Sequence, residues 1–341
     1  MNKFSIGVDL GGTNLRIAAV DDQGQLVEKV TLGTKVSLGR DHVIDDMCDA
    51  IQRLSEKFKD SAPLLGIGIG VPGIIDKETG LLRESPNLPG WADYPVRAEI
   101  ERRLKTIVIL ENDANVAALG EQWLGAAKDY SDIAMVTLGT GVGGGIVIGG
   151  EIFRGANGMA GEIGHCTVEP DGHPCGCGNI GCIEQYASAK AVVRMAREAI
   201  ARNGASALAR AAGSGAEFSA QSIYNLAIQG DEDARRVFRY MGRCLGILLA
   251  TLVNSLNLPI YVIGGGVSSA WDAFAPAVFD ELRRRALVYA ATAPPDPAAT
   301  HEGASAHVKT GSGHKTIITR ALLGSDAGLY GAARLPVIEA R

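Results

Sequence analysis

The stretch FSIGVDLGGTNLRIAAV, residues 4–20, decides the fold expected for this chain. Two apolar runs, Phe4–Leu10 and Leu15–Val20, flank Gly11-Gly12-Thr13, which predicts a buried strand, a tight turn and a second strand. The stretch MVTLGTGVGGGIVI, residues 135–148, repeats this order with glycines in its turn. Chance can produce so short a repeat. The alternative is a duplicated fold whose two copies close over one ligand from both sides.

Further along the chain, apolar runs alternate between strand and helix patterns. We expect strands at Leu65–Val71, Thr106–Leu110 and Ile260–Ile263, and helices at Val43–Lys57, Val96–Leu104 and Ala114–Leu124. Residues 74–95 predict a loop, residues 151–183 are irregular, and residues 291–315 predict an exposed loop. This alternation is typical of an α/β protein.

The bulk composition fits a globular protein of two domains. The chain has 341 residues, of which 46% are hydrophobic and 21% are charged. A prior of about 150 residues per domain gives the domain number. The net charge of -5 argues against a protein whose main partner is nucleic acid or an anionic membrane, because such proteins usually carry a basic face.

We expect neither an export signal nor a membrane span. Asp9 and the glycines after it interrupt any apolar region near the N-terminus. The longest apolar run, Leu245–Val253, is much shorter than the roughly 20 residues that cross a bilayer, so it predicts a buried helix. A cytoplasmic location follows as an expectation. There the six cysteines are expected to be metal ligands or buried thiols rather than disulfides.

The first glycine turn has the residue types of a phosphate site. Backbone amides at Gly11 and Gly12 can form a concave anion site, and Thr13 can donate to a phosphate. Asp9 can hold a magnesium ion, directly or through water. A plain hairpin turn explains the same residues equally well.

Two other phosphate motifs fit the sequence less well. Residues 139–144 match G-x-G-x-x-G, but a dinucleotide site needs a helix directly after the glycines, and a strand is expected there. Glu162 is near the spacing of a ribose-binding acid, yet it lies in a glycine-rich context that does not predict a strand. The stretch Thr310–Thr316 has His314 where a P-loop needs glycine, so we expect a loop.

A compact set of metal-binding residue types begins at His165 and continues with Cys175, Cys177 and Cys182. Three thiolates and one imidazole form a tetrahedral zinc set, and thiolates favour zinc over magnesium. Four protein ligands leave no open position, so the expected role is structural. His173 is a competing ligand, and scattered buried thiols are the alternative. The other cysteines are expected to be ordinary buried residues: Cys48, Cys166 and Cys244.

Carboxylates gather where a strand gives way to a helix. Glu111-Asn112-Asp113 ends the strand before Ala114–Leu124, and open α/β sheets bind ligands at such ends. A carboxylate there can accept the proton of a hydroxyl that attacks a phosphoryl group, whereas the alternative for Asp113 is a helix N-cap. Glu162 and Glu184 flank the cysteines, where zinc would hold them ready for a polyol. Otherwise they are solvated surface charges.

Together these residues resemble the ROK family of sugar kinases and sugar-responsive regulators. The resemblance runs over nearly the whole chain. Its most specific part is the cysteine block that follows Glu162-Ile-Gly-His165. The other matching motifs fall in the family's order: Asp9–Thr13, Pro86–Trp91, Glu111–Asp113, Leu138–Gly143, Gly264–Gly266 and Ala327–Ala332.

The resemblance implies an actin/hexokinase-like fold, in which two α/β domains with mixed sheets flank a cleft. The small domain would comprise residues 1–112 and 327–341, and the large domain residues 113–326, with the zinc segment at 162–184. The implied activity is phosphorylation of the 6-hydroxyl of a hexose, with glucose as the first choice. The implied cofactors are ATP with Mg²⁺ and one structural Zn²⁺. The implied protein is a cytoplasmic homodimer or homotetramer without a nucleic-acid or membrane partner.

The resemblance also implies roles for individual residues. Asp113 matches the catalytic base, and His165 would place one ring nitrogen on zinc and turn the other side of its ring to the sugar. The implied sugar contacts are Gly73, Asn87, Asn112, Asp113, Glu162, His165 and Glu184. The implied ATP contacts are Asp9, Gly11, Gly12, Thr13, Thr140, Gly141, Gly143, Gly264, Gly265 and Gly266. The implied zinc ligands are His165, Cys175, Cys177 and Cys182.

Three other functions stay open. Kinases of fructose, N-acetylmannosamine or N-acetylglucosamine would use the same mechanism. Fructose-specific relatives tend to replace part of the Cys-x-Cys block with histidine, so Cys175 and Cys177 favour glucose. A sugar-sensing regulator would carry an N-terminal helix-turn-helix domain, for which a phosphate loop at residue 9 leaves no room. A binding protein without catalysis would lack a base, and Asp113 is present.

Overall fold

The computed structural model describes residues 3–85, 87–204, 206–213, 217–294 and 314–339. Contacts between Cα atoms divide the chain into two compact units. Unit 1 comprises Met1–Met135, Gly145–Gly161 and Ala321–Arg341, and unit 2 comprises Val136–Gly144 and Glu162–Arg320. The domain limits expected at residues 112 and 327 stay a prediction.

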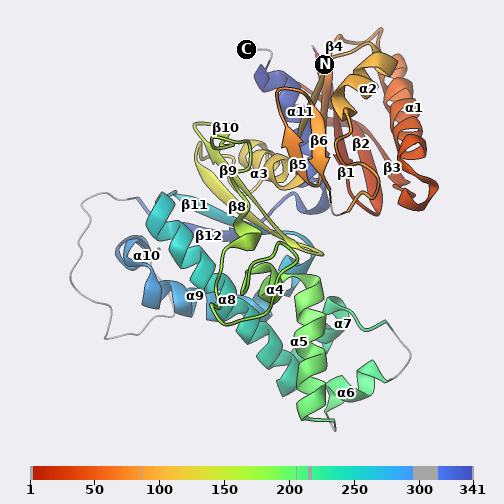
Figure 1. Ribbon diagram of the computed structural model, residues 1–341. Helices are drawn as coiled ribbons and strands as arrows, with labels where there is room; N and C mark the ends of the chain where they lie inside the picture. Colours follow the sequence, from red (N-terminus) through yellow and green to blue (C-terminus); the bar gives the residue numbers. More distant parts are fainter. Residues whose placement is uncertain (1–2, 86, 205, 214–216, 295–313, 340–341) are drawn as a thin grey trace. The chain divides into compact units, whose positions relative to one another are not determined.

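The first sheet has five strands in the order β3-β2-β1-β4-β7. Its strands are β1 (Phe4–Leu10), β2 (Asn14–Asp21), β3 (Leu26–Gly33), β4 (Leu64–Val71) and β7 (Val108–Asn112). The strands β1, β2 and β3 form an antiparallel meander (Figure 1), whereas β1, β4 and β7 run parallel. The carboxyl ends of β1, β4 and β7 therefore meet at one edge.

Alternating side chains separate the two faces of this sheet. The even-numbered residues of β1 face the main core, which also contains α1 (Arg40–Phe58) and α2 (Val96–Leu104). The opposite face packs against α11 (Ala327–Glu339), and α11 packs in turn against α3 (Asp113–Trp123). In Figure 1, the blue helix α11 and the orange-red helix α1 flank the same strands on opposite sides.

Glycines let α11 pack closely against both the sheet and α3. A Cβ atom on Gly68 of β4 would lie 1.9 Å from the carbonyl oxygen of Ala332, and one on Gly331 would lie 1.7 Å from that of Val116. Neither position has room for a side chain. The alternation of glycine with Ile67 and Ile69 in β4 follows from this packing, because the isoleucines fill the core on the other face.

The second sheet also has five strands, in the order β10-β9-β8-β11-β12. Its strands are β8 (Ile133–Leu138), β9 (Val142–Ile148), β10 (Glu151–Ile152), β11 (Ile260–Gly264) and β12 (Ile317–Arg320). The hairpin β8–β9 takes the place that β1–β2 has in the first sheet. The equal strand order fits a duplicated fold, which was the alternative to a chance repeat.

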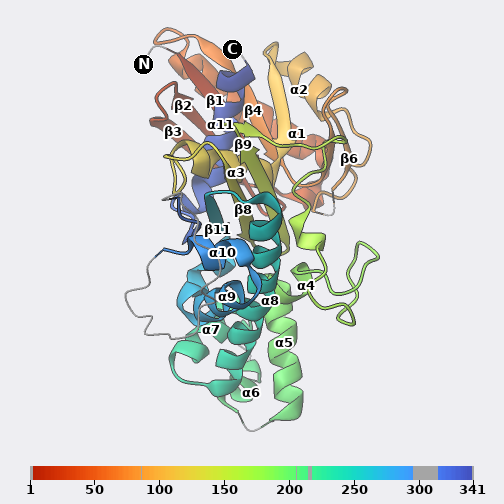
Figure 2. The same cartoon turned by 90° about the vertical axis from the view of Figure 1, so that its left-hand side faces the viewer.

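The helices of unit 2 follow the irregular cysteine segment. They are α4 (Glu184–Ala187), α5 (Ala189–Arg202), α6 (Ala207–Ala212), α7 (Ala220–Ile228), α8 (Glu232–Leu256), α9 (Trp271–Arg285) and α10 (Leu287–Thr292) (Figure 2). By length and composition alone α8 is long and apolar enough to cross a membrane. Its residues Leu245, Leu249 and Val253 are fully buried, as expected for a core helix of the fold.

Four details differ from the expectations. Residues 74–95 contain a hairpin of β5 (Ile74–Asp76) and β6 (Leu81–Glu84), whose strands are too short for a periodic pattern. The strands β3, β10 and β12 were also missed. Cys166 was expected to be buried but is exposed, because it follows the short helical turn Ile163–His165 at the surface. Of the loop expected at residues 291–315, α10 extends to Thr292, and residues 295–313 lie outside the described part of the chain.

A buried carboxylate fixes the entry to α11. Glu121 of α3 is fully buried. Its Oε2 accepts hydrogen bonds from the backbone amides of Ala126 (2.8 Å) and Leu322 (3.0 Å), and its Oε1 accepts one from Leu323 (2.7 Å). Two chain segments about 200 residues apart in sequence are joined by one buried side chain, which accepts hydrogen bonds from three backbone N–H groups.

We predict that Glu121→Gln lowers the free energy of unfolding by about 1–3 kcal/mol, because an amide offers one acceptor oxygen and leaves at least one amide unpaired. Urea unfolding followed by tryptophan fluorescence measures the change. The control is Glu56→Gln, whose side chain is 59% exposed and whose effect should stay within about 0.5 kcal/mol. Equal midpoints for the two variants would contradict the structural role of Glu121.

Candidate functional site

The carboxyl edge of the first sheet brings together the chemical groups expected in unit 1. The strand β1 runs into Gly11–Thr13, β4 runs into Pro72–Gly73, and β7 runs into Asp113. The register pairs Asp9 with Gly70 and Gly70 with Glu111 across the three parallel strands. A parallel sheet presents its ligand groups at this edge.

The first glycine turn is closed by Thr34. The Gly11 amide donates to the carbonyl oxygen of Asn14 at 2.9 Å. The buried Thr34 donates its hydroxyl to the Gly11 carbonyl at 2.6 Å, and its amide donates to Thr13 at 2.9 Å. Gly12 lies against the next loop, since a Cβ atom on it would be 3.3 Å from the carbonyl oxygen of Asn87.

Asp9 forms an ion pair with Arg16 across the hairpin, at 2.9 Å between Oδ2 and Nη1. Burial raises the pKa of Asp9, and this effect outweighs the lowering by the Arg16 guanidinium. The antiparallel register places the two residues opposite each other. The sequence offered this signal, because a turn at residues 11–13 sets position 9 against position 16, but the pair was not predicted.

Glu111 is a buried carboxylate held by two cations. Its Oε2 lies 3.0 Å from Nζ of Lys77 and 2.7 Å from Nε of Arg154, and its side chain is 3% exposed. Burial alone would raise the pKa of Glu111, but the charges and hydrogen bonds of Lys77 and Arg154 together lower it. Its Oε1 accepts from the Asn112 amide (3.0 Å) and from Nδ2 of Asn115 (3.1 Å). We call these residues, Lys77, Glu111, Asn115 and Arg154, the Glu111 cluster.

The Glu111 cluster stands directly beside the predicted base. Asn112 is the N-cap of α3, and its Oδ1 accepts from the amides of Ala114 (2.9 Å) and Asn115 (3.3 Å). Asp113 is therefore the first residue of the helix rather than its cap, and its Oδ1 accepts from the Ala114 amide at 2.9 Å. The Nδ2 group of Asn112 donates to the Gly73 carbonyl at 3.2 Å, which ties β4 to β7 at their ends.

In unit 2, the second glycine turn is supported by Glu184. The Gly139 amide donates to the Gly141 carbonyl at 2.9 Å, and Oε2 of Glu184 accepts from the Val142 amide at 3.1 Å. A Cβ atom on Gly141 would lie 2.3 Å from that oxygen, so a side chain there would force the Glu184 carboxylate to move. Gly143 belongs to β9 rather than to the turn.

The glycines at the end of β11 lie against the end of β8. Gly265 has a φ of 81°, and a Cβ atom on it would lie 2.4 Å from the Leu138 carbonyl oxygen. Gly266 faces open space, with nothing within 4 Å of a Cβ atom. The backbone after β11 is thus accessible at Gly266 and close to the start of the second glycine turn at Gly265.

The four predicted metal ligands converge in unit 2. The ligand atoms of His165, Cys175, Cys177 and Cys182 all lie within 4.8 Å of one another. Sγ of Cys175 is 3.7 Å from Nδ1 of His165, and the sulfur atoms of Cys177 and Cys182 are 3.8 Å apart. A tetrahedral zinc ion with Zn–S bonds of about 2.3 Å needs sulfur atoms about 3.8 Å apart, so the set fits zinc.

The competing ligand His173 points elsewhere, with Nε2 3.3 Å from Oε1 of Glu198. Nε2 of His165 lies 3.8 Å from Oε2 of Glu162. The two nitrogens of the His165 ring therefore face different partners, the cysteine set through Nδ1 and a carboxylate through Nε2. This arrangement fits the double role expected for His165.

The predicted site residues thus form one group in each unit. Unit 1 holds the residues of the first glycine turn together with Gly73, Asn87, Asn112 and Asp113. Unit 2 holds Thr140, Gly141, Gly143, Glu162, Glu184, Gly264–Gly266 and the cysteine set. Sequence reasoning missed Lys77 and Arg154, because nothing in their own segments indicates a distant buried carboxylate.

Comparisons with known proteins agree with these motifs. The model of the ROK family matches residues 5–310. A glucokinase of Halalkalibacterium halodurans is 38% identical over 336 residues, which cover 98% of this chain and 95% of that protein. A xylose repressor of Caldicellulosiruptor bescii is 31% identical over 284 residues, which cover 83% of this chain and 71% of the repressor.

A solved structure extends the likeness to the fold. The ROK family glucokinase of Streptomyces griseus, in complex with glucose and AMPPNP, is 33% identical and has a TM-score of 0.76. The alignment covers 97% of this chain and 98% of that chain. The α/β fold with two mixed sheets is the actin/hexokinase-like fold that the resemblance implied. On the family match and the identity to curated relatives, this chain belongs to the ROK family.

Proposed function

We propose that this chain transfers the γ-phosphoryl group of ATP to the 6-hydroxyl of glucose. The observation that carries the proposal is the position of Asp113, at the carboxyl edge of a parallel sheet and directly after the Glu111 cluster. Family relatives named glucokinase, including one solved with glucose and AMPPNP, support glucose as the acceptor and ATP as the donor. The family match supports a hexose kinase in general.

In this proposal Asp113 is the general base. As the sugar oxygen forms its bond to the γ-phosphorus and the bond to the β-phosphate oxygen breaks, Asp113 accepts the hydroxyl proton and ADP leaves. Asp113 lies in the first turn of α3, where the helix dipole interacts favourably with a negative charge. The hydrogen bond from the Ala114 amide fixes the orientation of the carboxylate.

The two glycine turns would hold the phosphates of ATP. Thr13 and Thr140 are exposed. Gly11 and Gly12 precede Thr13, and Gly139 and Gly141 flank Thr140, so little side-chain bulk covers the backbone amides of the two turns. Mg²⁺ bound with ATP supplies charge neutralisation at the phosphoryl oxygens, and Asp9 is the carboxylate that would hold it. The glycines after β11, Gly264 to Gly266, would bind ATP, with Gly265 near the adenosine.

A zinc ion at the cysteine set would be structural, since four protein ligands leave no position for a substrate. Zinc would fix His165 and with it the segment that carries Glu162. Glu162 and His165 would then meet sugar hydroxyls without further ordering. Gly73, Asn87, Asn112 and Glu184 complete the proposed sugar contacts, and Asn112 keeps one amide hydrogen beyond the bond to Gly73.

Two rival functions have support in the same family. A kinase of N-acetylmannosamine, N-acetylglucosamine or fructose would share the base and the phosphate turns. The similarity to xylose repressors favours a sugar-responsive regulator as the second candidate. A gel-shift assay with sheared genomic DNA, with and without glucose, separates kinase from regulator.

The proposed kinase is a cytoplasmic homodimer or homotetramer without a nucleic-acid partner.

We predict ATP-dependent phosphorylation of glucose in preference to mannose, fructose, N-acetylglucosamine and N-acetylmannosamine. A coupled assay for ADP across the five sugars measures kcat/KM for each. Preference for an N-acetyl sugar would keep the mechanism and overturn the acceptor. Absence of activity on all five sugars, in protein that is folded and contains zinc, would contradict the proposed function.

We predict that Asp113→Asn lowers kcat by about 100- to 10,000-fold, the usual contribution of a general base, while the affinity for glucose changes little. The matched control is Asp129→Asn, which changes an exposed aspartate without a proposed role. Steady-state kinetics measure kcat, and equilibrium titration measures glucose binding. Retained turnover in Asp113→Asn would refute the assignment of the base.

We predict about one zinc ion per chain in the purified protein, measured by elemental analysis. Cys177→Ser should lose most of the metal and lower the thermal stability of unit 2. Cys166→Ser is the control, because its thiol is exposed and lies outside the ligand set. Absence of zinc from the wild type, or equal zinc in both variants, would overturn the metal site.

A further inference from the structure

The helix α1 begins with a residue that suits a helix start poorly. Its N-cap, Gly39, offers no side-chain hydrogen bond, and its first residue is Arg40. A cation at a helix N-terminus is unfavourable, because the helix dipole places partial positive charge there. Asp41, the next residue, offsets this effect through its Oδ1, which accepts from Nε of Arg40 at 3.1 Å. One contact of Arg40 thus lies within α1, and its other contacts lie outside the helix.

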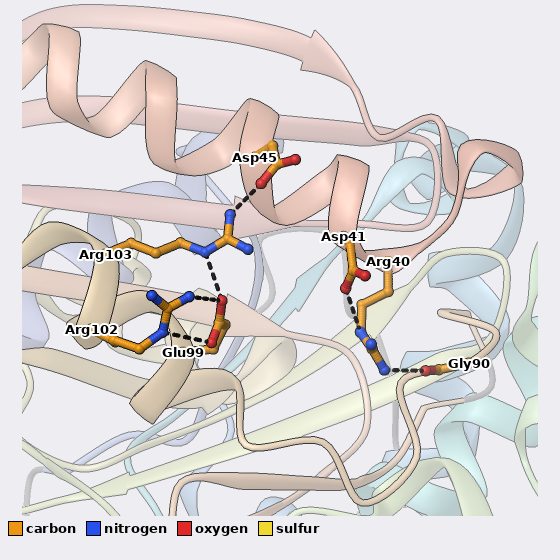
Figure 3. A network of polar contacts seen from close by, with 7 residues as sticks. All are labelled: Arg40, Asp41, Asp45, Gly90, Glu99, Arg102 and Arg103. Carbon is orange, nitrogen blue, oxygen red and sulfur yellow. Dashed lines mark hydrogen bonds and ion pairs between the residues drawn. The ribbon is translucent and has the colours of Figure 1, made fainter.

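Arg40 reaches out of its helix to a loop that carries a proposed sugar contact. Its Nη1 donates to the Gly90 carbonyl at 3.2 Å, as Figure 3 shows. Its guanidinium carbon lies 3.8 Å from the centre of the Tyr94 ring. Residues 87–94 are called the Asn87 loop. Arg40 thus contacts this loop in two ways, through a hydrogen bond from its planar guanidinium group and through stacking of that cation on an aromatic ring.

The Asn87 loop is anchored on one side and exposed on the other. Leu88 and Trp91 are buried, and the Trp91 ring meets the Tyr94 ring edge to face at 6.2 Å. Gly90 is exposed, has a φ of 80° and has nothing within 4 Å of a Cβ position. At the start of the loop the backbone of Asn87 lies against Gly12 of the first glycine turn.

The other charges of Figure 3 serve a different purpose. Arg103 pairs with both Glu99 of its own helix and Asp45 of α1, and so joins α2 to α1. Hydrogen bonds from Arg102 and Arg103 lower the pKa of Glu99 to about 2. The hydrogen bonds of the Arg102 side chain go to Glu99 alone among the residues that the structure describes. Arg102 is therefore a natural comparison for Arg40.

We propose that Arg40 is a positioning residue that holds the Asn87 loop in its sugar-binding conformation and thereby sets the affinity for the sugar. This inference rests on the proposed function. When only a fraction of the protein has the competent loop, the apparent dissociation constant of the sugar rises in inverse proportion to that fraction. The Gly90 hydrogen bond and the Tyr94 stacking are the contacts that keep this fraction high.

The test compares Arg40→Ala, Arg40→Lys and Arg102→Ala in the full-length protein with glucose and MgATP. Arg40→Ala should raise KM and Kd for glucose about 5- to 30-fold, the combined weight of one hydrogen bond and one cation–π contact, with KM for ATP unchanged. Arg40→Lys keeps the charge without the planar fork and should fall in between. Arg102→Ala should match the wild type.

Hydrogen exchange in the protein without sugar gives a second readout that does not depend on activity. Amides of the Asn87 loop should exchange faster in Arg40→Ala than in Arg102→Ala, at similar melting temperatures. Equal exchange in the two variants would contradict the claim that Arg40 holds the Asn87 loop. Faster exchange in Arg40→Ala with unchanged sugar affinity would contradict a role of the loop conformation in sugar binding. An inactive wild type would refute the proposed function, while the exchange experiment would still decide whether Arg40 holds the loop.

Discussion

The buried charge of Glu111 is the constraint on which the arrangement of unit 1 at the sheet edge depends. An isolated carboxylate at this depth would cost several kcal/mol, so its counter-charges must come to it. Lys77 arrives from the turn between β5 and β6, and Arg154 from the segment that follows β10. The remaining oxygen accepts from Asn112 and Asn115, which places the start of α3. Two segments and the first turn of a helix are thus located by one side chain.

The buried charge of Glu111 also determines where the residues of the proposed reaction lie. Asp113, the proposed base, follows Glu111 by two residues, so the contacts that satisfy the buried charge also locate the backbone that carries Asp113. Asn112 cannot turn freely, because it caps α3 and donates to Gly73. The glycine turns add little side-chain bulk, and their backbone is held by the hydrogen bonds of Thr34 and Glu184.

Much of this fold could be predicted from local pattern. The strands β1, β4 and β8 are apolar runs next to glycine turns, and the helices α1 and α2 have clear apolar faces. The cluster of His165 and three cysteines could be predicted because its members lie close together in sequence, and the structure brings the same four residues together. The short hairpin β5–β6 was missed, because three or four residues carry too little periodicity.

Contacts between distant segments could not be read in the same way. Lys77 and Arg154 look like surface cations in their own segments, and only the fold brings them to Glu111. Arg40 at the start of α1 gives no local sign that it holds residues 50 positions away. Cys166 was predicted to be buried because cysteines usually are. It is exposed, because it follows a helical turn at the surface.

The identity of the phosphorylated atom tests the central claim most directly. Glucose labelled with carbon-13 at carbon 6 is incubated with the wild-type protein and MgATP, and the carbon and phosphorus NMR spectra are followed together. The account predicts a shifted carbon-6 resonance that is split by coupling to phosphorus, in step with the loss of ATP. An unchanged carbon-6 resonance, with ATP either intact or hydrolysed to free phosphate, would contradict it.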